Sequence, residues 1–280
     1  MKLIRTACVA ILLFALAGCS STFAYRNLDW LVHWFVDDYI DLTTEQKRAF
    51  DQKMTVWLNW HKTEELPKYQ QQLSMLKNQL QAGNMQATDW MAHFRTGRNH
   101  WERLRRHLAP DLSELAASVS NDQIDEFVEA VTKYIKEERG KYDDLSDEER
   151  MEKRIESMED DLREYIGRLS DSQKQLVTTY AAKLQRNIYW RDYQARVLEE
   201  IEKLLREKAI NPQFEQDVAA LIIYPEQFRL PEHNQVSEHN KRVYAAYYAD
   251  LMATLSPKQK KRLLKKIDDL IDDIEDMKSS

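Results

Sequence analysis

Apolar and polar residues recur with a helical period along most of the chain. The aromatic-rich stretch "LDWLVHWFVDDYIDL", Leu28 to Leu42, places its apolar residues at helical spacing and predicts a helix. From Ser170 to Ile210 neither glycine nor proline interrupts the pattern, which predicts one helix spanning roughly 60 Å. The β-branched run from Ala220 to Pro225 continues a helical pattern. We therefore expect an all-α, elongated, multi-helix domain with short loops and at least one long helix.

Five short motifs mark where helices begin. In each, an apolar residue precedes serine or threonine, and glutamine or glutamate stands three positions after the hydroxyl residue. These are capping boxes, in which the two side chains satisfy free main-chain amides at the helix start. The pairs are Thr43 with Gln46, Ser120 with Gln123, Ser146 with Glu149, Ser170 with Gln173, and Ser256 with Gln259. Their irregular spacing argues against a solenoid, so we interpret them as a repeated way of starting helices.

Glycine and proline mark the expected helix ends. These residues are Pro67, Gly83, Pro110, Gly140, Gly167 and Pro225. Asn211-Pro212 predicts a further helix start, with proline at the first helical position. We expect the longest irregular segment between Pro225 and Val236.

The first 18 residues have the features of a secretory signal. Lys2 and Arg5 precede an apolar run, Ala7 to Ala17, that is shorter than the ~20 residues of a membrane-spanning helix. The sequence "LAGC", Leu16 to Cys19, resembles the lipobox of bacterial lipoproteins, which implies cleavage before Cys19 and acylation of that residue. An ordinary signal peptide followed by a chance cysteine is the alternative.

The residue after Cys19 indicates the membrane in which we expect the protein. Ser20 stands where an aspartate would resemble an inner-membrane retention signal, so we expect the outer membrane, facing the periplasm. The expected organisation is a signal peptide over 1–18, a lipidated cysteine and tether over 19–27, and a helical periplasmic domain over 28–280.

Charge and composition exclude several classes of partner and ligand. Without the signal, the chain holds 39 basic and 47 acidic residues, a net charge of −8, which argues against nucleic acid. Its four remaining glycines are too widely spaced for a phosphate-binding loop or a dinucleotide fingerprint. Cys19 is the sole cysteine left, so we expect no disulfide and no cofactor.

Two stretches of the chain resemble known protein families. "LTTEQ" at Leu42 and its relatives resemble the signature of small periplasmic chaperones of the Spy and CpxP type, which implies binding of unfolded chains; helix capping alone also explains them. The stretch "YRNLDWLVHWFVDDYIDLTTEQ", followed by "WLNWHKTEELPKY", resembles a Gram-negative lipoprotein family of unknown function. That resemblance implies a helical outer-membrane lipoprotein without implying an activity.

A histidine–carboxylate group is the candidate for catalysis. Asp29, His33 and Asp37 lie four positions apart and share one helix face, and His61 stands beside two glutamates on the next helix. If the helices pair, histidine could act as a base oriented by aspartate. The alternative, which we favour, is a polar edge without catalysis.

Metal binding is not expected. His93, His100 and His107 recur every seven residues, which places neighbours about 10.5 Å apart along a helix, too far to share one ion. The Glu-x-x-His motif of di-iron bundles does not occur.

Four tryptophans lie early in the chain: Trp30, Trp34, Trp57 and Trp60. Their closeness to Cys19 suggests a membrane-surface helix, which is normally basic. The segment from Leu28 to Leu42 contains four aspartates and no lysine or arginine. We therefore expect a helix packed into the core.

The last helix has its charges reversed relative to the helix dipole. Basic residues crowd its start and acidic residues its end, whereas the dipole favours the opposite order. We expect the basic half to meet another helix of the chain, or an external ligand such as a lipid phosphate. The candidate interaction residues are Lys261, Arg262, Lys265 and Lys266.

The leading functional hypothesis is a lipid-anchored, non-enzymatic interaction or scaffold protein of the envelope. Its partners would be the membrane, through lipid on Cys19, and an envelope protein of unknown identity. A chaperone-like helical cradle is the second hypothesis, and an enzyme using the Asp29, His33 and Asp37 face is the third.

Overall fold

The computed structural model describes residues 20–143 and 145–279, and every secondary-structure element in these ranges is helical. The prediction of an all-α, elongated domain is confirmed. The helices are α2 (Ser20–Arg26), α3 (Leu28–Val36), α4 (Thr44–Trp60), η1 (His61–Glu65), α5 (Leu66–Ala82), α6 (Ala87–Ala117), α7 (Asn121–Asp143), α8 (Asp147–Ile166), α9 (Asp171–Ala181), α10 (Trp190–Glu207), α11 (Phe214–Ile223), η2 (Pro225–Phe228), α12 (Pro231–Ala253) and α13 (Pro257–Ser279). The predicted signal peptide, residues 1–18, and Cys19 lie outside the described residues.

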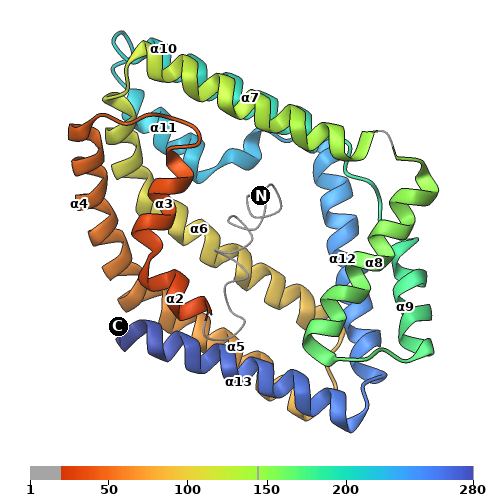
Figure 1. Ribbon diagram of the computed structural model, residues 1–280. Helices are drawn as coiled ribbons and strands as arrows, with labels where there is room; N and C mark the ends of the chain where they lie inside the picture. Colours follow the sequence, from red (N-terminus) through yellow and green to blue (C-terminus); the bar gives the residue numbers. More distant parts are fainter. Residues whose placement is uncertain (1–19, 144, 280) are drawn as a thin grey trace.

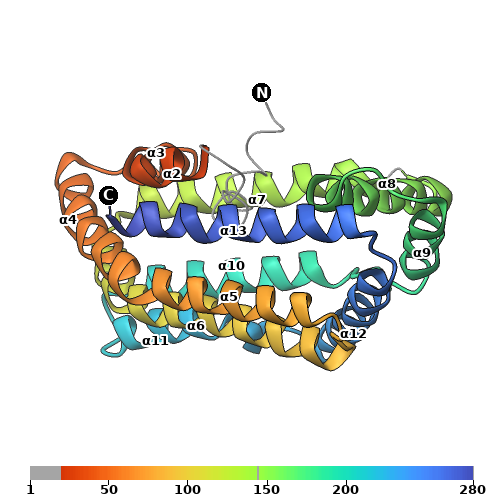
Figure 2. The same ribbon diagram turned by 90° about the horizontal axis from the view of Figure 1, so that it is seen from below.

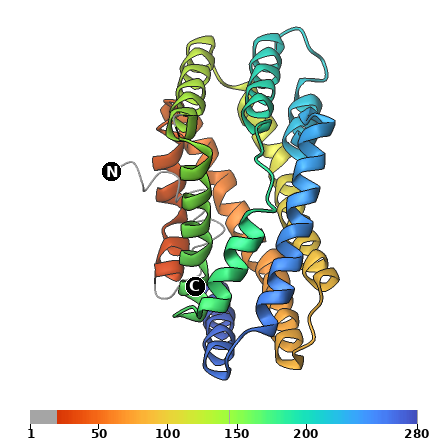
Figure 3. The same ribbon diagram turned by 90° about the vertical axis from the view of Figure 1, so that its right-hand side faces the viewer.

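The helices form a closed frame (Figure 1). Helices α7 and α10 run together along one side, and α5 and α13 along the opposite side. Helix α6 crosses the frame and packs on α11 near one end and on α12 near the other. Figures 2 and 3 show two layers, with α2, α3, α7, α8 and α13 in one and α5, α6, α10, α11 and α12 in the other.

The frame has no single central core. In the described residues most of the buried apolar side chains fall into five clusters. Ile124 of α7 packs with Leu204 of α10, for example, whereas Leu162 of α8 packs with Val177 of α9 and Leu251 of α12. Each cluster joins helices that lie next to one another, so the overall shape depends on how the corners of the frame are fixed.

All five capping boxes form as predicted. Thr43, Ser146 and Ser170 accept from the third main-chain amide of their helices, and the glutamine or glutamate accepts from the cap amide. The same two hydrogen bonds occur at Ser120 with Gln123 and at Ser256 with Gln259.

Four of these boxes also bind one another in two pairs. The amides of Gln46 and Gln123 exchange hydrogen bonds of 3.1 and 2.7 Å, and those of Gln173 and Gln259 exchange bonds of 3.1 and 2.9 Å. Each glutamine also donates to the main-chain carbonyl two residues before its partner's cap; the acceptors are Ser118, Asp41, Thr254 and Arg168. The motifs therefore join α4 to α7 and α9 to α13, a role beyond starting helices.

The long helix lies elsewhere than expected. Helices α4, η1 and α5 run without a break from Thr44 to Ala82, whereas the stretch from Ser170 to Ile210 divides into α9 and α10. The break at 182–189 is stabilised by other helices. The Arg154 guanidinium donates to the Ala181 and Leu184 carbonyls at 2.9 and 3.0 Å, and Asn240 bonds both the amide and the carbonyl of Gln185. Tertiary contacts here replace the hydrogen bonds that would have continued the helix.

Some predicted helix ends are correct and others are wrong. Gly83 and Gly167 end helices with φ angles of 78° and 81°, which glycine adopts without strain. Pro67, Pro110 and Gly140 lie inside helical segments. Pro67 follows the wide π-helical turn η1, in which the Leu66 amide reaches back to the His61 carbonyl.

Three further boundaries differ from expectation. The segment from Pro225 to Val236 is mostly helical, because η2 begins at Pro225 and α12 at Pro231. Helix α11 begins at Phe214, since the Asn211 side chain accepts from the Gln213 amide and forms a turn first. Residues 20–26 of the expected tether form α2, which packs on α13.

Candidate functional site

An apolar groove of about 460 Å³ lies at the corner where α3, α4, α6, α7, α10 and α11 meet (Figure 1). Val36 and Phe50 line it from α3 and α4, Leu112 from α6, Phe127 from α7, and Ile222 from α11. Of these, only Phe50 is fully buried, and the others remain partly exposed. The volume is within the usual range for ligand pockets in proteins.

The groove offers almost no polar group to a ligand. Its polar lining consists of Gln46, Ser118 and Gln123. The two glutamines bond each other, and the Ser118 hydroxyl donates to the Leu115 carbonyl at 2.7 Å. What remains is hydrocarbon surface, so the groove suits an apolar segment and provides no group for acid, base or nucleophilic chemistry.

A second candidate is a polar cluster around the wide turn η1, built on one buried carboxylate. Glu65 is fully buried and binds Arg103 of α6 through two hydrogen bonds, Oε1 to Nε at 2.7 Å and Oε2 to Nη2 at 2.9 Å. His100 Nδ1 lies 3.5 Å from Glu65 Oε2, and Lys68 Nζ lies 3.5 Å from Oε1. Burial alone raises the pKa of Glu65, but Arg103 outweighs it, with help from Lys68 and His100, and holds that pKa below its ordinary value.

His61 belongs to the same cluster. Its Nδ1 lies 3.0 Å from the Tyr25 hydroxyl of α2, and its ring makes an edge contact with Tyr69. Burial lowers the pKa of His61 to about 4, although the nearby Glu65 acts in the opposite direction. The cluster therefore holds a neutral histidine that ties the N-terminal helix to the frame.

His61 predicts a pH dependence of stability. Its pKa is about 4 in the folded chain and about 6.5 unfolded, so between these values the unfolded chain binds more protons. The free energy of unfolding should fall by on the order of 2–3 kcal/mol as pH falls through this window. His61→Gln should flatten part of this dependence in urea titrations at pH 7, 6 and 5, and a slope identical to that of the wild-type chain would contradict the assignment.

The structure does not assemble the histidine–carboxylate group expected on α3. His33 Nε2 makes a short contact with the Asp51 carboxylate of α4, and Asp37 pairs with Lys47 at 3.2 Å. Asp29 is exposed. His61 instead faces Tyr25, so the four expected residues have four different surroundings.

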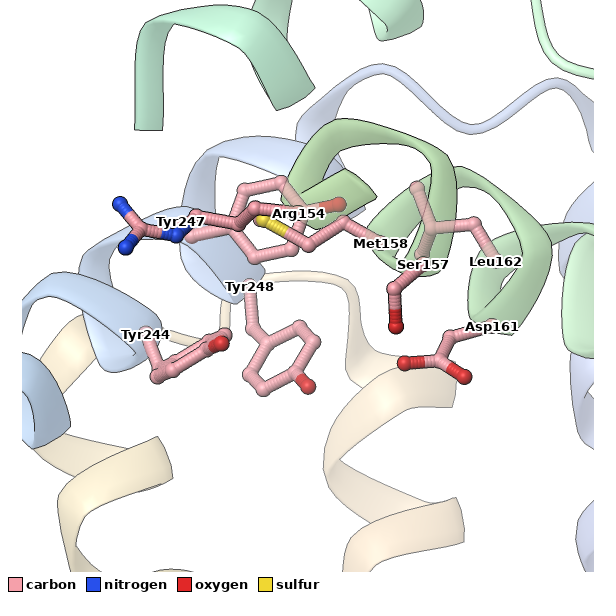
Figure 4. Close-up of a pocket in the computed structure, with 8 residues that line it drawn as sticks. All are labelled: Arg154, Ser157, Met158, Asp161, Leu162, Tyr244, Tyr247 and Tyr248. Atoms are coloured by element: carbon pink, nitrogen blue, oxygen red, sulfur yellow. The ribbon is translucent and has the colours of Figure 1, made fainter. Parts of the chain in front are cut away.

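A smaller pocket of about 140 Å³ lies between α8 and α12 (Figure 4). The Asp161 carboxyl and the Ser157 hydroxyl point into the same space as the Tyr248 hydroxyl. Burial, together with Glu164 and Asp160, raises the pKa of Asp161. The Arg154 guanidinium points away from the pocket and donates to the Ala181 carbonyl at the end of α9. The pocket therefore presents one carboxyl and several hydroxyls without a nucleophile–base pair.

The expectation that residues 28–42 form a core helix is wrong. Helix α3 contains no fully buried residue, and Trp30 is 64 % exposed. Trp57 of α4 alone among the four early tryptophans is fully buried, and Trp60 stacks on His107 with ring centroids 3.8 Å apart. The sequence pattern showed an apolar face but not whether another helix covers it.

The basic residues at the start of α13 contact other helices of the same chain. Lys260 donates to the Gln81 carbonyl near the end of α5, and Arg262 donates to the Glu164 carbonyl near the end of α8, both at 3.2 Å. Helix C-termini carry partial negative charge, which the basic start of α13 neutralises. Lys266 lies 4.0 Å from the Glu164 carboxylate, Lys265 pairs with Asp269, and Lys261 is exposed.

Two of the three histidines of α6 form hydrogen bonds with glutamine side chains of α5. His93 and His100 contact the amide oxygens of Gln79 and Gln72, each at 2.7 Å. Over residues 20–143 and 145–279 there is no group of three potential ligands suited to a metal ion. A search of the same residues finds no helix both long and apolar enough to span a membrane.

Comparison with known proteins gives one match. A model of a family of unknown function, DUF6279, matches residues 38–234. No curated protein and no solved structure matches the chain. The expected membership of an uncharacterised family is thus confirmed, while neither a lipoprotein nor a Spy- or CpxP-type chaperone is among the matches.

Sequence reasoning did not single out the groove residues. Leu112 and Phe127 follow the helical period like any core residue, so their positions in the sequence carried no distinguishing signal.

Proposed function

Because the chain belongs to the DUF6279 family, whose function is unknown, we propose from its structure that it is a non-enzymatic, lipid-anchored envelope protein that binds an apolar segment of a partner protein. The lipid would be carried by Cys19, in the outer membrane and facing the periplasm, as the lipobox-like "LAGC" suggests. The corner groove is the proposed binding site.

The observation that carries this proposal is the groove's size together with its apolar lining. A sealed, empty cavity of about 460 Å³ would cost roughly 11 kcal/mol, as much as the whole folding free energy of many domains. An open groove exposes the same hydrocarbon surface to water instead. Covering it with an amphipathic helix from a partner removes that surface from water, as in other helix-in-groove complexes.

A chaperone-like cradle is the second candidate, and the same groove favours it. With its glutamines bonded to each other, the groove has no polar group that would select one sequence over another. Segments of many unfolded chains could then occupy it. The number of distinct partners separates the two candidates.

Photo-crosslinking tests the groove directly. A benzoylphenylalanine placed at Phe127, which lines the groove, should crosslink in cells to one envelope protein, which is then purified. The same crosslinker at Trp101 of α6, which is 46 % exposed and outside the groove lining, is the matched control. Many adducts of different sizes at Phe127 would favour the cradle, and equal crosslinking from both positions would contradict the groove as the site.

Binding of the purified partner gives the quantitative test. Ile222→Asp places a charge in the apolar lining and should weaken binding at least roughly tenfold, because burying the carboxylate costs more than 1.4 kcal/mol. Circular dichroism and thermal unfolding check that the variant remains folded. Unchanged affinity in a folded Ile222→Asp chain would exclude the groove.

A further inference from the structure

Two large aromatic side chains stand out on the N-terminal helices. Phe23 of α2 is 70 % exposed and Trp30 of α3 is 64 % exposed. Asn27 joins the two helices at a bend: its amide bonds the Phe23 carbonyl at 3.2 Å and its carbonyl accepts from the Leu31 amide at 3.0 Å, while its φ of −113° and ψ of 25° are not helical. Within its own helix each aromatic residue stands two positions, about 200°, before a side chain that packs on the frame, so both lie on the side turned away from it.

The opposite side of these helices holds them against the frame. Tyr25 packs beside Leu66 and the end of α13, and Val32 and Val36 pack against the cluster of Phe50 and Trp57. The segment thus has two apolar sides, one of which the protein itself covers. Figure 2 shows α2 and α3 lying along the outer edge of their layer.

The position of the segment in the chain indicates what covers the other side. Ser20, the first residue of α2, directly follows Cys19, so no linker separates the helix from the proposed lipid. In the sequence Phe23 stands four residues and Trp30 eleven residues after Cys19. A helix attached in this way stays at the depth of the lipid headgroups.

We propose that Phe23 and Trp30 insert into the boundary between headgroups and acyl chains and hold the frame in a fixed orientation on the membrane. The inference rests on the proposed lipidation of Cys19. Tryptophan favours this boundary, where its ring leaves water and its indole N–H remains hydrated, and phenylalanine inserts a wholly apolar ring at the same depth. The acyl chains supply the affinity, so the segment needs no basic stripe. Asp37 beside it is paired with Lys47, and Asp29 lies about 100° around the helix from Trp30.

The test uses the mature chain, residues 19–280, whose only cysteine is Cys19. Coupling that thiol to a maleimide lipid in phosphatidylethanolamine–phosphatidylglycerol vesicles replaces the natural anchor. Brominated lipids in the vesicles then quench only tryptophans that contact the bilayer. Quenching should be clear in the wild-type chain, fall in Trp30→Phe, and remain in Trp101→Phe, the matched exposed tryptophan on α6. Phe23→Ser, which keeps every tryptophan, should also reduce quenching by weakening insertion.

Two outcomes would overturn the proposal. One is the absence of quenching in the coupled wild-type chain, which would indicate that a protein, not lipid, covers this side. The other is an equal loss of quenching in Trp30→Phe and Trp101→Phe. Lipidation is tested separately in cells, where Cys19→Ser should abolish palmitate labelling and release the protein from the membrane. Failure of the anchor and failure of the inserted aromatics are therefore distinguishable.

Discussion

Replacing Gln173 with alanine should lower the free energy of unfolding by roughly 3 kcal/mol, because the change leaves several buried polar groups without partners. The Gln173 side chain is 1 % exposed. It accepts from the Ser170 amide at 3.0 Å and exchanges hydrogen bonds with the Gln259 amide. Alanine would remove the capping box of α9 and the link to α13 together.

Urea titration measures this effect, and the chain offers a close control. Gln175 lies on the same helix but is exposed, so Gln175→Ala should change stability by less than about 0.5 kcal/mol. The double variant Gln173→Ala/Gln259→Ala should cost less than the two single losses added together, since either change already breaks the shared bonds. Additive losses would show that the two glutamines do not stabilise each other.

The paired capping boxes were predictable from the sequence as helix starts, but their binding to one another was not. The hydroxyl and the residue three positions later predict a helix start from local geometry alone, and each predicted start is present. Mutual binding requires that two starts, 77 or 86 residues apart, meet in space. One signal was visible: the four paired motifs carry glutamine, which can donate, whereas the exposed Glu149 cannot complete such a pair.

The wrong predictions have a related cause. An uninterrupted apolar pattern predicted one helix over 170–210, but Arg154 and Asn240 bind the main chain at 182–189 and stabilise a break there. Trp30 lies in an amphipathic pattern typical of a core helix, yet its side of α3 faces outward. Periodicity predicts that a face is apolar; the tertiary structure decides what covers it.

The second large effect is expected at the ion pair between Glu65, which is fully buried, and Arg103, which is partly exposed. Arg103→Met should lower the free energy of unfolding by roughly 3–5 kcal/mol at pH 7, because it removes the bidentate partner of a fully buried carboxylate. Lys68 at 3.5 Å and His100, whose pKa is lowered first by burial and then by Arg103, compensate only in part. The wide turn η1 places Glu65 at this position, so the loss should propagate to the packing of α4 and α5 on α6.

Two controls separate the pair from general damage to α6. Arg106→Met, one turn along the same helix, breaks a surface pair with Glu102 and should change the stability far less than Arg103→Met. The double variant Glu65→Met/Arg103→Met should recover much of the lost stability, since no unpaired charge then remains buried.

The direction of the pH dependence follows from the direction in which the pKa of Glu65 is shifted. In the wild-type chain the pKa of Glu65 is held below its ordinary value, so the pair stabilises the fold above about pH 4.5 and loses that contribution as pH falls through the folded-state pKa. Without Arg103, burial would dominate and raise the pKa of Glu65. The variant could then bury a neutral carboxyl under acid conditions. The stability difference between Arg103→Met and wild type should therefore shrink as pH falls from 7 to 4 in guanidinium titrations. A difference that stays constant over this range would mean that Arg103 stabilises the fold through packing and not through the charge of Glu65.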